Sequence, residues 1–340
     1  MNCKVYNNTV SGYDFKGGGC HYCDISNSII ENNSKLGTSG GGGGCSNSTC
    51  TNTLIRSNRS ENSGGGCFAS TCINTFIGHN ISSGGGGGLS DSSVAINCEI
   101  ASNTTSGGSS NVGGGGGSNN SNNTNCNIHH NSASASYNNS GGGGTSRGTN
   151  INCNIYCNLT TTVYWGGGTY NSANINCAIY NNYSNNIGGG CYGGSAVNCT
   201  IISNKAVAAG GTNNTTLKNT VVYGNKLTTM VKSNAVNTNS SVETYCAFED
   251  EVRAGTGNIS LSVNNEGDAN SPCFQSLSTD VGVVDETLVS NANICNASFL
   301  IDKGNGADNA TGYGATYDLA GLERKKDTID IGAYENQKTV

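Results

Sequence analysis

The sequence predicts an all-β fold, a right-handed parallel β-helix in which each sequence repeat makes one turn, or rung, of a coil. Three observations support this: a repeat of about 24 residues, strand-like alternation inside it, and a composition rich in glycine and poor in charge. Of 340 residues, 52 are glycine, one is proline, 34% are hydrophobic and 11% are charged. That balance disfavours both a disordered chain and an ordinary α/β core.

The repeat is the pattern Asn-[Cys/Ser/Thr]-x-[Ile/Val]-x-x-Asn, which occurs ten times within residues 2–225. Neighbouring copies start 21 to 28 residues apart, and glycine runs separate most of them. A unit this short, without a helical apolar stripe, fits one turn of a parallel-strand solenoid, and the usual crossover rule makes the coil right-handed. The second and fourth positions are small or β-branched and should face inward, whereas the third and fifth vary and should face outward.

The last asparagine of each copy predicts a ladder of stacked amides along the coil. Asparagine tolerates the left-handed backbone of a tight corner, and its amide can bond to the next copy about 4.8 Å away. A general excess of asparagine would not place the residue in one register ten times. The glycine runs should occupy a second point of each turn, where φ is positive or backbones approach closely. The ladder residues are Asn8, Asn33, Asn58, Asn80, Asn103, Asn131, Asn158, Asn182, Asn204 and Asn225.

The 17 cysteines include two patterned sets. The first set occupies the inward second position, where in-register parallel side chains fit disulfide geometry poorly, so we expect buried stacked thiols. Its consecutive members are Cys98, Cys126, Cys153, Cys177 and Cys199. The second set follows the first three glycine runs as the pairs Cys20/Cys23, Cys45/Cys50 and Cys67/Cys72. For these pairs, thiols and local or rung-to-rung disulfides remain alternatives. Zinc is disfavoured because the spacing widens and the histidine is lost, so no metal or cofactor is expected.

Two parts of the chain resemble known families. The alternation of Gly-Gly-Gly with Asn-Cys-x-Ile-x-x-Asn, over residues 1–225, resembles the repeats of chlamydial polymorphic outer-membrane proteins and related β-helical adhesins. The segments from Asp318 to Arg324 and from Asp330 to Glu335 are similar to the choice-of-anchor Q domain, which closes many secreted right-handed β-helix proteins. This resemblance implies an exported protein of the cell surface or the extracellular space.

The domain organisation follows from charge as well. Residues 1–225 carry eight Lys/Arg and six Asp/Glu, whereas 226–340 carry eight and sixteen. We therefore expect about ten regular rungs over 1–225, and an acidic region over 226–340 that continues the coil irregularly and caps it. The opening residues lack the apolar stretch of a signal peptide, so either the chain stays inside the cell or an upstream segment precedes it.

Catalysis finds little support in the residue pattern. A polyuronate lyase calls for clustered Arg, Lys and calcium-binding Asp, and hydrolysis needs two carboxyls about 5 to 9.5 Å apart. Glu31 and Glu99 are the acids at outward strand positions, and they lie three rungs apart. Asp24 and Glu31 share a turn but are more simply explained as solvated surface. We assign no catalytic residue, and a carbohydrate-active β-helix enzyme, a polysaccharide lyase or glycoside hydrolase, stays the alternative.

Ligand binding finds more support than catalysis, because the outward fifth position of the repeat becomes mostly aromatic from the sixth copy onward. The candidate ligand-binding residues are His129, Tyr156, Tyr180, Tyr223 and, in the same third of the chain, Trp165. Such rings could stack on sugars or anchor a protein, although tyrosine also suits exposed strands. The sequence favours a non-enzymatic adhesin or surface-presenting stalk that binds a glycan or a host or cell-surface protein. A net charge of −6 argues against nucleic acid, and no apolar run suits a membrane span.

Overall fold

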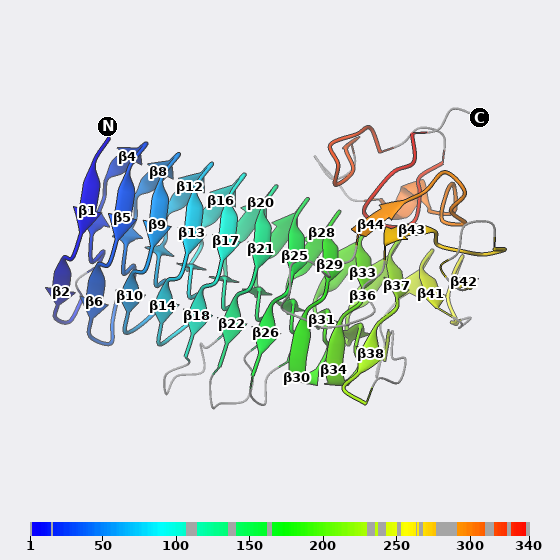
Figure 1. The fold of residues 1–340 in the computed structure, drawn as a ribbon, viewed down its shortest axis with the longest axis horizontal. Helices are drawn as coiled ribbons and strands as arrows, with labels where there is room; N and C mark the ends of the chain where they lie inside the picture. The colour runs from blue at the N-terminus through cyan, green and yellow to red at the C-terminus, as the bar shows by residue number, and fades with distance from the viewer. Residues whose placement is uncertain are drawn as a thin grey trace.

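The computed structural model is a coil of parallel strands with four sheets along its sides, and a C-terminal segment lies beside the last turns (Figure 1). The predicted parallel β-helix is confirmed. Among the described residues, no helix is long and apolar enough to cross a membrane. The structure describes residues 2–14, 16–106, 114–134, 141–161, 165–229, 235–236, 243–249, 253–262, 264, 268–276, 291–309, 316–324 and 328–337.

Sheet A carries the apolar column of the core. Its strands, in order, are β1 (Lys4–Tyr6), β5 (Ile29–Glu31), β9 (Leu54–Arg56), β13 (Phe76–Gly78), β17 (Glu99–Ala101), β21 (Asn127–His129), β25 (Asn154–Tyr156), β29 (Ala178–Tyr180), β33 (Thr200–Ile202), β37 (Val221–Tyr223), β41 (Ala247–Glu249) and β42 (Ile259–Leu261). From β5 to β33 the central residue is a fully buried isoleucine, the fourth position of the repeat. Each contributes about 1.5–3 kcal/mol by burial.

Three further sheets complete the turn. Sheet B contains β2 (Thr9–Ser11), β6 (Ser34–Leu36), β10 (Arg59–Ser60), β14 (Ile81–Ser82), β18 (Thr104–Thr105), β22 (Ser132–Ala133), β26 (Leu159–Thr160), β30 (Tyr183–Ile187), β34 (Lys205–Ala208) and β38 (Lys226–Leu227). Sheet C contains β3 (Cys20–His21), β7 (Cys45–Ser46), β11 (Cys67–Phe68), β15 (Leu89–Ser90), β19 (Ser118–Asn119), β23 (Thr145–Ser146), β27 (Thr169–Tyr170), β31 (Cys191–Tyr192), β35 (Thr212–Asn213) and β39 (Ala235–Val236). Sheet D contains β4 (Asp24–Ser26), β8 (Thr49–Thr51), β12 (Thr71–Ile73), β16 (Val94–Ile96), β20 (Asn122–Thr124), β24 (Thr149–Ile151), β28 (Ala173–Ile175), β32 (Ser195–Val197), β36 (Thr216–Lys218) and β40 (Glu243–Thr244).

The asparagine ladder between sheets A and B is confirmed, running without a break from Asn8 to Asn225. The Nδ2 group of Asn158 donates to Oδ1 of Asn182 (3.0 Å) and to the carbonyl of Ile128 (2.8 Å). Its own Oδ1 accepts the side-chain and backbone N–H groups of Asn131. The ladder therefore satisfies side chains that are buried in the core, as buried polar groups require.

The left-handed corner lies one residue earlier than the sequence suggested. The ladder asparagines have ordinary φ, whereas the preceding residue is left-handed, as in Ser57 (φ 54°) and Cys157 (φ 52°). The first asparagine of the repeat is also left-handed, and its amides form a second column, with Asn152 donating to Asn125 (3.3 Å). The glycine runs behave as predicted: Gly142 has φ +81°, and a Cβ on Gly143 would lie 2.5 Å from a neighbouring carbonyl.

The inward cysteine column consists of free, buried thiols. Each thiol donates to a backbone carbonyl: Cys126 donates to the carbonyl of Thr124 (3.2 Å) and Cys153 to that of Ile151 (3.3 Å). Serine and threonine make the same contact at this position in other rungs, as Thr53 does to Thr51 (2.9 Å). This position of the repeat therefore suits small side chains that can donate to the backbone carbonyl two residues earlier.

Replacing Asn131 or Asn158 with Leu should destabilise the protein by about 1–3 kcal/mol, because neighbouring amides and a carbonyl lose their partners in the core. Chemical denaturation monitored by circular dichroism measures the change. Asn122, an exposed asparagine of β20, provides the control, and its replacement with Ala should have little effect. Unchanged stability in both ladder variants would contradict the structural role of the ladder.

Cys126, Cys153 and Cys177 should resist alkylation in the native state. They should react fully after denaturation without reductant, because they are buried thiols whose alkylation requires unfolding. Mass spectrometry of alkylated peptides measures both states. Disulfide-linked peptides containing any of the three would show that the column is oxidised instead.

Candidate functional site

The C-terminal segment folds back against the outer face of sheet A (Figure 1). We call its described residues from 268 onward the cap; they include β43 (Phe274–Ser276), antiparallel to β44 (Asn291–Ile294), and the 3₁₀ turn η2 (Gly306–Asp308). Cap residues Phe274, Leu300 and Ile331 pack with Ile202 and Val221 of the coil. The cap therefore covers the side of the last turns, while β41 and β42 continue sheet A beyond them.

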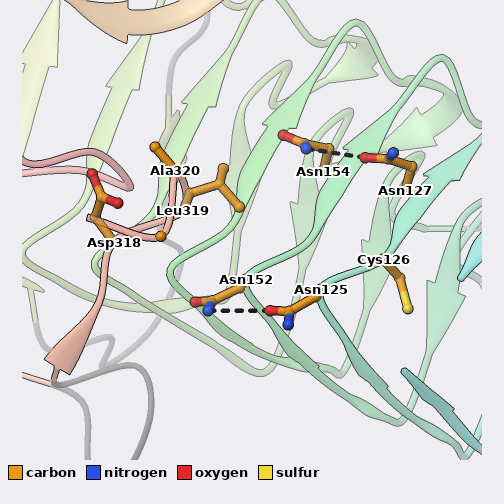
Figure 2. Close-up of a pocket in the computed structure, with 9 residues that line it drawn as sticks. Asn125, Cys126, Asn127, Asn152, Asn154, Asp318, Leu319 and Ala320 are labelled. Carbon is orange, nitrogen blue, oxygen red and sulfur yellow. Dashed lines mark hydrogen bonds between the residues drawn. The ribbon is translucent and has the colours of Figure 1, made fainter. Parts of the chain in front are cut away.

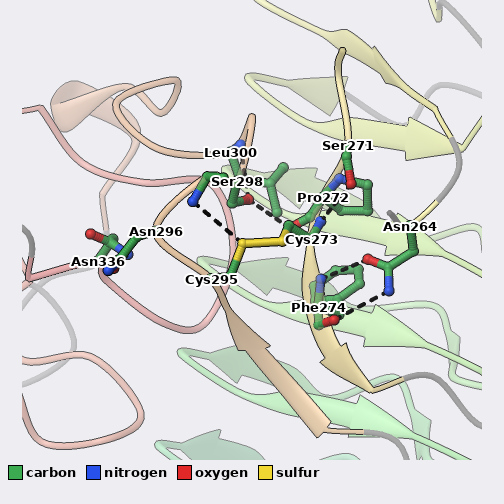
Figure 3. The surroundings of a disulfide bond; sticks show 11 residues. Asn264, Ser271, Pro272, Cys273, Phe274, Cys295, Asn296, Ser298, Leu300 and Asn336 are labelled. Carbon is green, nitrogen blue, oxygen red and sulfur yellow. Dashed lines mark hydrogen bonds between the residues drawn. A yellow bond between two sulfur atoms is a disulfide. The ribbon is translucent and has the colours of Figure 1, made fainter. Parts of the chain in front are cut away.

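A disulfide between Cys273 and Cys295 closes the β43–β44 hairpin (Figure 3). Close by, the Ser298 hydroxyl donates to the carbonyl of Pro272 (2.6 Å). The bond joins two strands that pair in antiparallel fashion. Sequence reasoning missed it, because neither cysteine belongs to a repeat; their position outside both patterned sets was the available signal.

The predicted aromatic column exists on sheet A, but its rings stack on one another. His129 lies 4.7 Å from Tyr156 with an interplanar angle of 11°, and Tyr156 lies 5.1 Å from Tyr180 at 1°. His129 is also held by Glu99 (3.3 Å) and His130 (2.8 Å). Because the ring faces cover each other, the column presents edges to the outside rather than faces on which a sugar could stack.

The cap removes part of this column from the surface. Tyr223 is 4% exposed, lies edge-to-face with Phe274 and donates its hydroxyl to the carbonyl of Ser262 (2.9 Å). Burial also raises the pKa of the Tyr180 hydroxyl. Tyr223 is therefore a packing residue, whereas Tyr156 and Tyr180 stay half-buried.

Trp165 lies on a different face. It stacks on Tyr192 of sheet C (4.7 Å, 17°), beside Tyr170, over which the guanidinium of Arg147 lies at 5.7 Å. Tyr170 is 3% exposed. The structure therefore places Trp165 in a separate aromatic cluster and does not bring it together with His129 and the tyrosines of sheet A.

A hollow of about 270 Å³ opens where the cap meets the coil (Figure 2). Two rows of amides form its floor: Asn154 donates to Asn127 (3.1 Å) and Asn152 to Asn125 (3.3 Å). Its lining residues are Asn125, Cys126, Asn127, Asn152, Asn154, Asp318, Leu319, Ala320 and Gly321. The floor thus offers hydrogen-bond donors and acceptors, and the cap supplies an apolar wall at Leu319.

The acid that lines the hollow and the outward acid of β5, on the first turns, are both engaged. Asp318 accepts the backbone N–H groups of Leu322 (2.8 Å) and Glu335 (2.9 Å) with its two carboxylate oxygens. Glu31 pairs with Lys4 (2.7 Å) and Arg56 (2.9 Å), and these hydrogen bonds lower its pKa. Among the described residues, no group of three or more His, Cys, Asp or Glu could hold a metal ion. The hollow therefore offers amide hydrogen-bonding groups, and its acid Asp318 is held by backbone N–H groups.

A buried cluster of ionisable groups fixes the wall of the hollow. Arg324 has no exposed surface; it donates to the carbonyl of Ala333 (2.8 Å) and lies 3.7 Å from Glu335. Burial raises the pKa of Asp330 to about 6 and that of Glu335 to about 8. Asp330 accepts the N–H groups of Asp302 (2.7 Å) and Asn336 (2.7 Å), so the cluster joins three separate cap segments.

No protein-family model matches the chain, and no curated protein matches it. Among solved structures, the chain is similar to the crystal structure of the pectate lyase Pel9A, with 13% sequence identity and a TM-score of 0.36. The likeness covers 98% of this chain and 73% of the lyase chain. At this level of likeness we infer neither the fold nor the activity of this chain from the lyase.

Cap stability should fall as pH rises from about 4 to about 8. The pKa values of Asp330 and Glu335 are raised above the unfolded values, so the folded state binds their protons more tightly, and this stabilisation disappears as each carboxyl ionises. Amide hydrogen exchange in residues 330–336, expressed as protection relative to the intrinsic exchange rate at each pH, measures this stability. Glu335→Gln should flatten the fall near pH 8, and a cap that becomes more stable across the same range would contradict the prediction.

Proposed function

We propose that the chain is a non-catalytic β-helix protein of the cell surface or extracellular space, an adhesin or surface-presenting stalk, whose hollow at the coil–cap junction binds a glycan. The observation that supports this most is the double row of amides beneath an apolar cap wall. Sugars combine hydroxyls that donate and accept with apolar C–H faces, which is the combination that Asn127, Asn154 and Leu319 provide.

The volume of the hollow limits the size of the ligand that it can hold. Pockets for drug-sized ligands usually enclose roughly 300–1,000 Å³. At about 270 Å³ the hollow suits one sugar residue, at a chain end or projecting from a longer chain. The amide rows belong to β21, β25 and the corners before them, so the rigid coil holds them in place before a ligand arrives.

The same geometry favours binding over catalysis. Glycoside hydrolysis needs a pair of carboxyls, one of which is free to give or take a proton. Asp318 is the acid among the lining residues, and backbone N–H groups occupy both of its oxygens. A lyase would require a lysine or arginine as its base, and neither is found among those lining residues. The carbohydrate-active enzyme therefore remains the weaker hypothesis.

Surface location rests on two supports. The repeats and the two cap segments resemble polymorphic outer-membrane repeats and the choice-of-anchor Q domain, families of exported proteins. The Cys273–Cys295 disulfide also suits an oxidising compartment, since such bonds are rare in the cytosol. Both supports agree with an adhesin that meets a host or cell-surface glycan.

Replacing both Asn127 and Asn154 with Ala should weaken glycan binding about tenfold or more, because several hydrogen bonds to the ligand are lost. A glycan array followed by titration calorimetry on the best ligand measures the loss. Tyr156→Ala should also weaken binding, because Tyr156 follows the lining residue Asn154 by two positions on β25. Asp24→Asn with Glu31→Gln, on the distant first turns, is the control and should bind normally.

Two outcomes would contradict the proposal. Binding that survives in the Asn127/Asn154 variant would place the ligand elsewhere on the coil. Cleavage of a polysaccharide by the wild-type chain, lost when Glu99 or Asp318 is replaced, would favour the enzyme instead.

A further inference from the structure

Two inward positions face each other across the corner between sheets C and D, five residues apart in most turns. In β19 and β20, the amide of Asn123 donates to the hydroxyl of Ser118 (3.1 Å). The next turns repeat this contact, from Asn150 to Thr145 (3.0 Å) and from Asn174 to Thr169 (3.3 Å). The two positions therefore act as a pair whose side chains meet inside the coil.

Cysteine occupies both positions of this pair in the turns of β7–β8 and β11–β12. The sulfurs of Cys45 and Cys50 lie 3.6 Å apart, and those of Cys67 and Cys72 lie 3.5 Å apart. All four side chains are fully buried. Their arrangement differs from that of the inward column, where Cys126 directs its sulfur to a backbone carbonyl.

We propose that Cys45–Cys50 and Cys67–Cys72 are in-rung disulfide sites, which close as the chain folds in an oxidising environment. The sulfurs of Cys45 and Cys67, on neighbouring turns, are also close at 3.2 Å. However, these two side chains leave parallel strands in register, and parallel Cβ vectors fit a disulfide poorly. The in-rung partners come from two different sheets, and their sulfurs meet at 3.5–3.6 Å inside the coil.

The chemistry requires an external disulfide, such as glutathione disulfide. The thiolate of one cysteine attacks a glutathione sulfur and releases one glutathione; the thiolate of its partner attacks the mixed disulfide and releases the second. Two thiol protons leave, and the two electrons reduce glutathione disulfide to two glutathione molecules. All four sulfurs are fully buried in the folded coil, where glutathione disulfide cannot reach them, so the exchange belongs to the folding chain.

The test is oxidative refolding of the full chain in glutathione and glutathione disulfide, followed by N-ethylmaleimide labelling in denaturant. Digestion after Lys/Arg and after Glu separates residues 36–56, with Cys45 and Cys50, from residues 62–99, with Cys67, Cys72 and Cys98. We expect peptide 36–56 unlabelled and two hydrogens lighter, and peptide 62–99 labelled once. Formation of the Cys273–Cys295 bond in the same sample is the positive control.

Full labelling of both peptides beside an oxidised Cys273–Cys295 bond would overturn the proposal. A covalent link between peptides 36–56 and 62–99 would also overturn it, in favour of rung-to-rung pairing. The matched variant is Cys45→Thr with Cys50→Asn, which copies the Thr145/Asn150 pair of another turn. It should fold and keep the Cys67–Cys72 bond; labelling of Cys67 in this variant would show that Cys67 had depended on Cys45. None of these outcomes depends on glycan binding.

Discussion

In-register stacking of the turns is the constraint on which the rest of the structure depends. Because each turn lies about 4.8 Å from the next, the packing and hydrogen-bonding requirements of one position recur at the same position of every turn. An amide carries both a donor and an acceptor, so it can pass a hydrogen bond along such a column indefinitely. Amide columns accordingly occur at the Asn131–Asn158 ladder, at the Asn125–Asn152 corner and inside sheet D, where Asn123 donates to Asn150 (2.9 Å).

The same constraint shapes the outer face. Identical side chains at one position of neighbouring turns contact each other, so the rings of Tyr156 and Tyr180 stack face to face. Those ring faces are then not available to a ligand. What is left for recognition is the ring edge and the amide rows beside it. A parallel β-helix therefore gains a concave site where a second element, here the cap segment with Leu319, rises beside the regular coil.

The coil could be predicted from sequence because its signals repeat. The isoleucine column, the ladder and the glycine corners each recur from turn to turn, although the left-handed residue is Cys157 rather than Asn158. The cap could not be predicted in this way. Nothing periodic indicates that Phe274 covers Tyr223, or that Cys273 pairs with Cys295, and an outward strand position looks exposed until its cover is known.

The folded-back cap gives the fold a kinetic asymmetry. Most contacts of the coil join neighbouring turns, so a turn can form as soon as the previous one exists. The last turns are different: Asn219 bonds to Asn305, and Asn176 bonds to Tyr317 across 141 residues of sequence. Such distant closures are slow. The coil can therefore grow turn by turn during synthesis, while the amide-lined hollow is completed only when the final segment of the chain has docked.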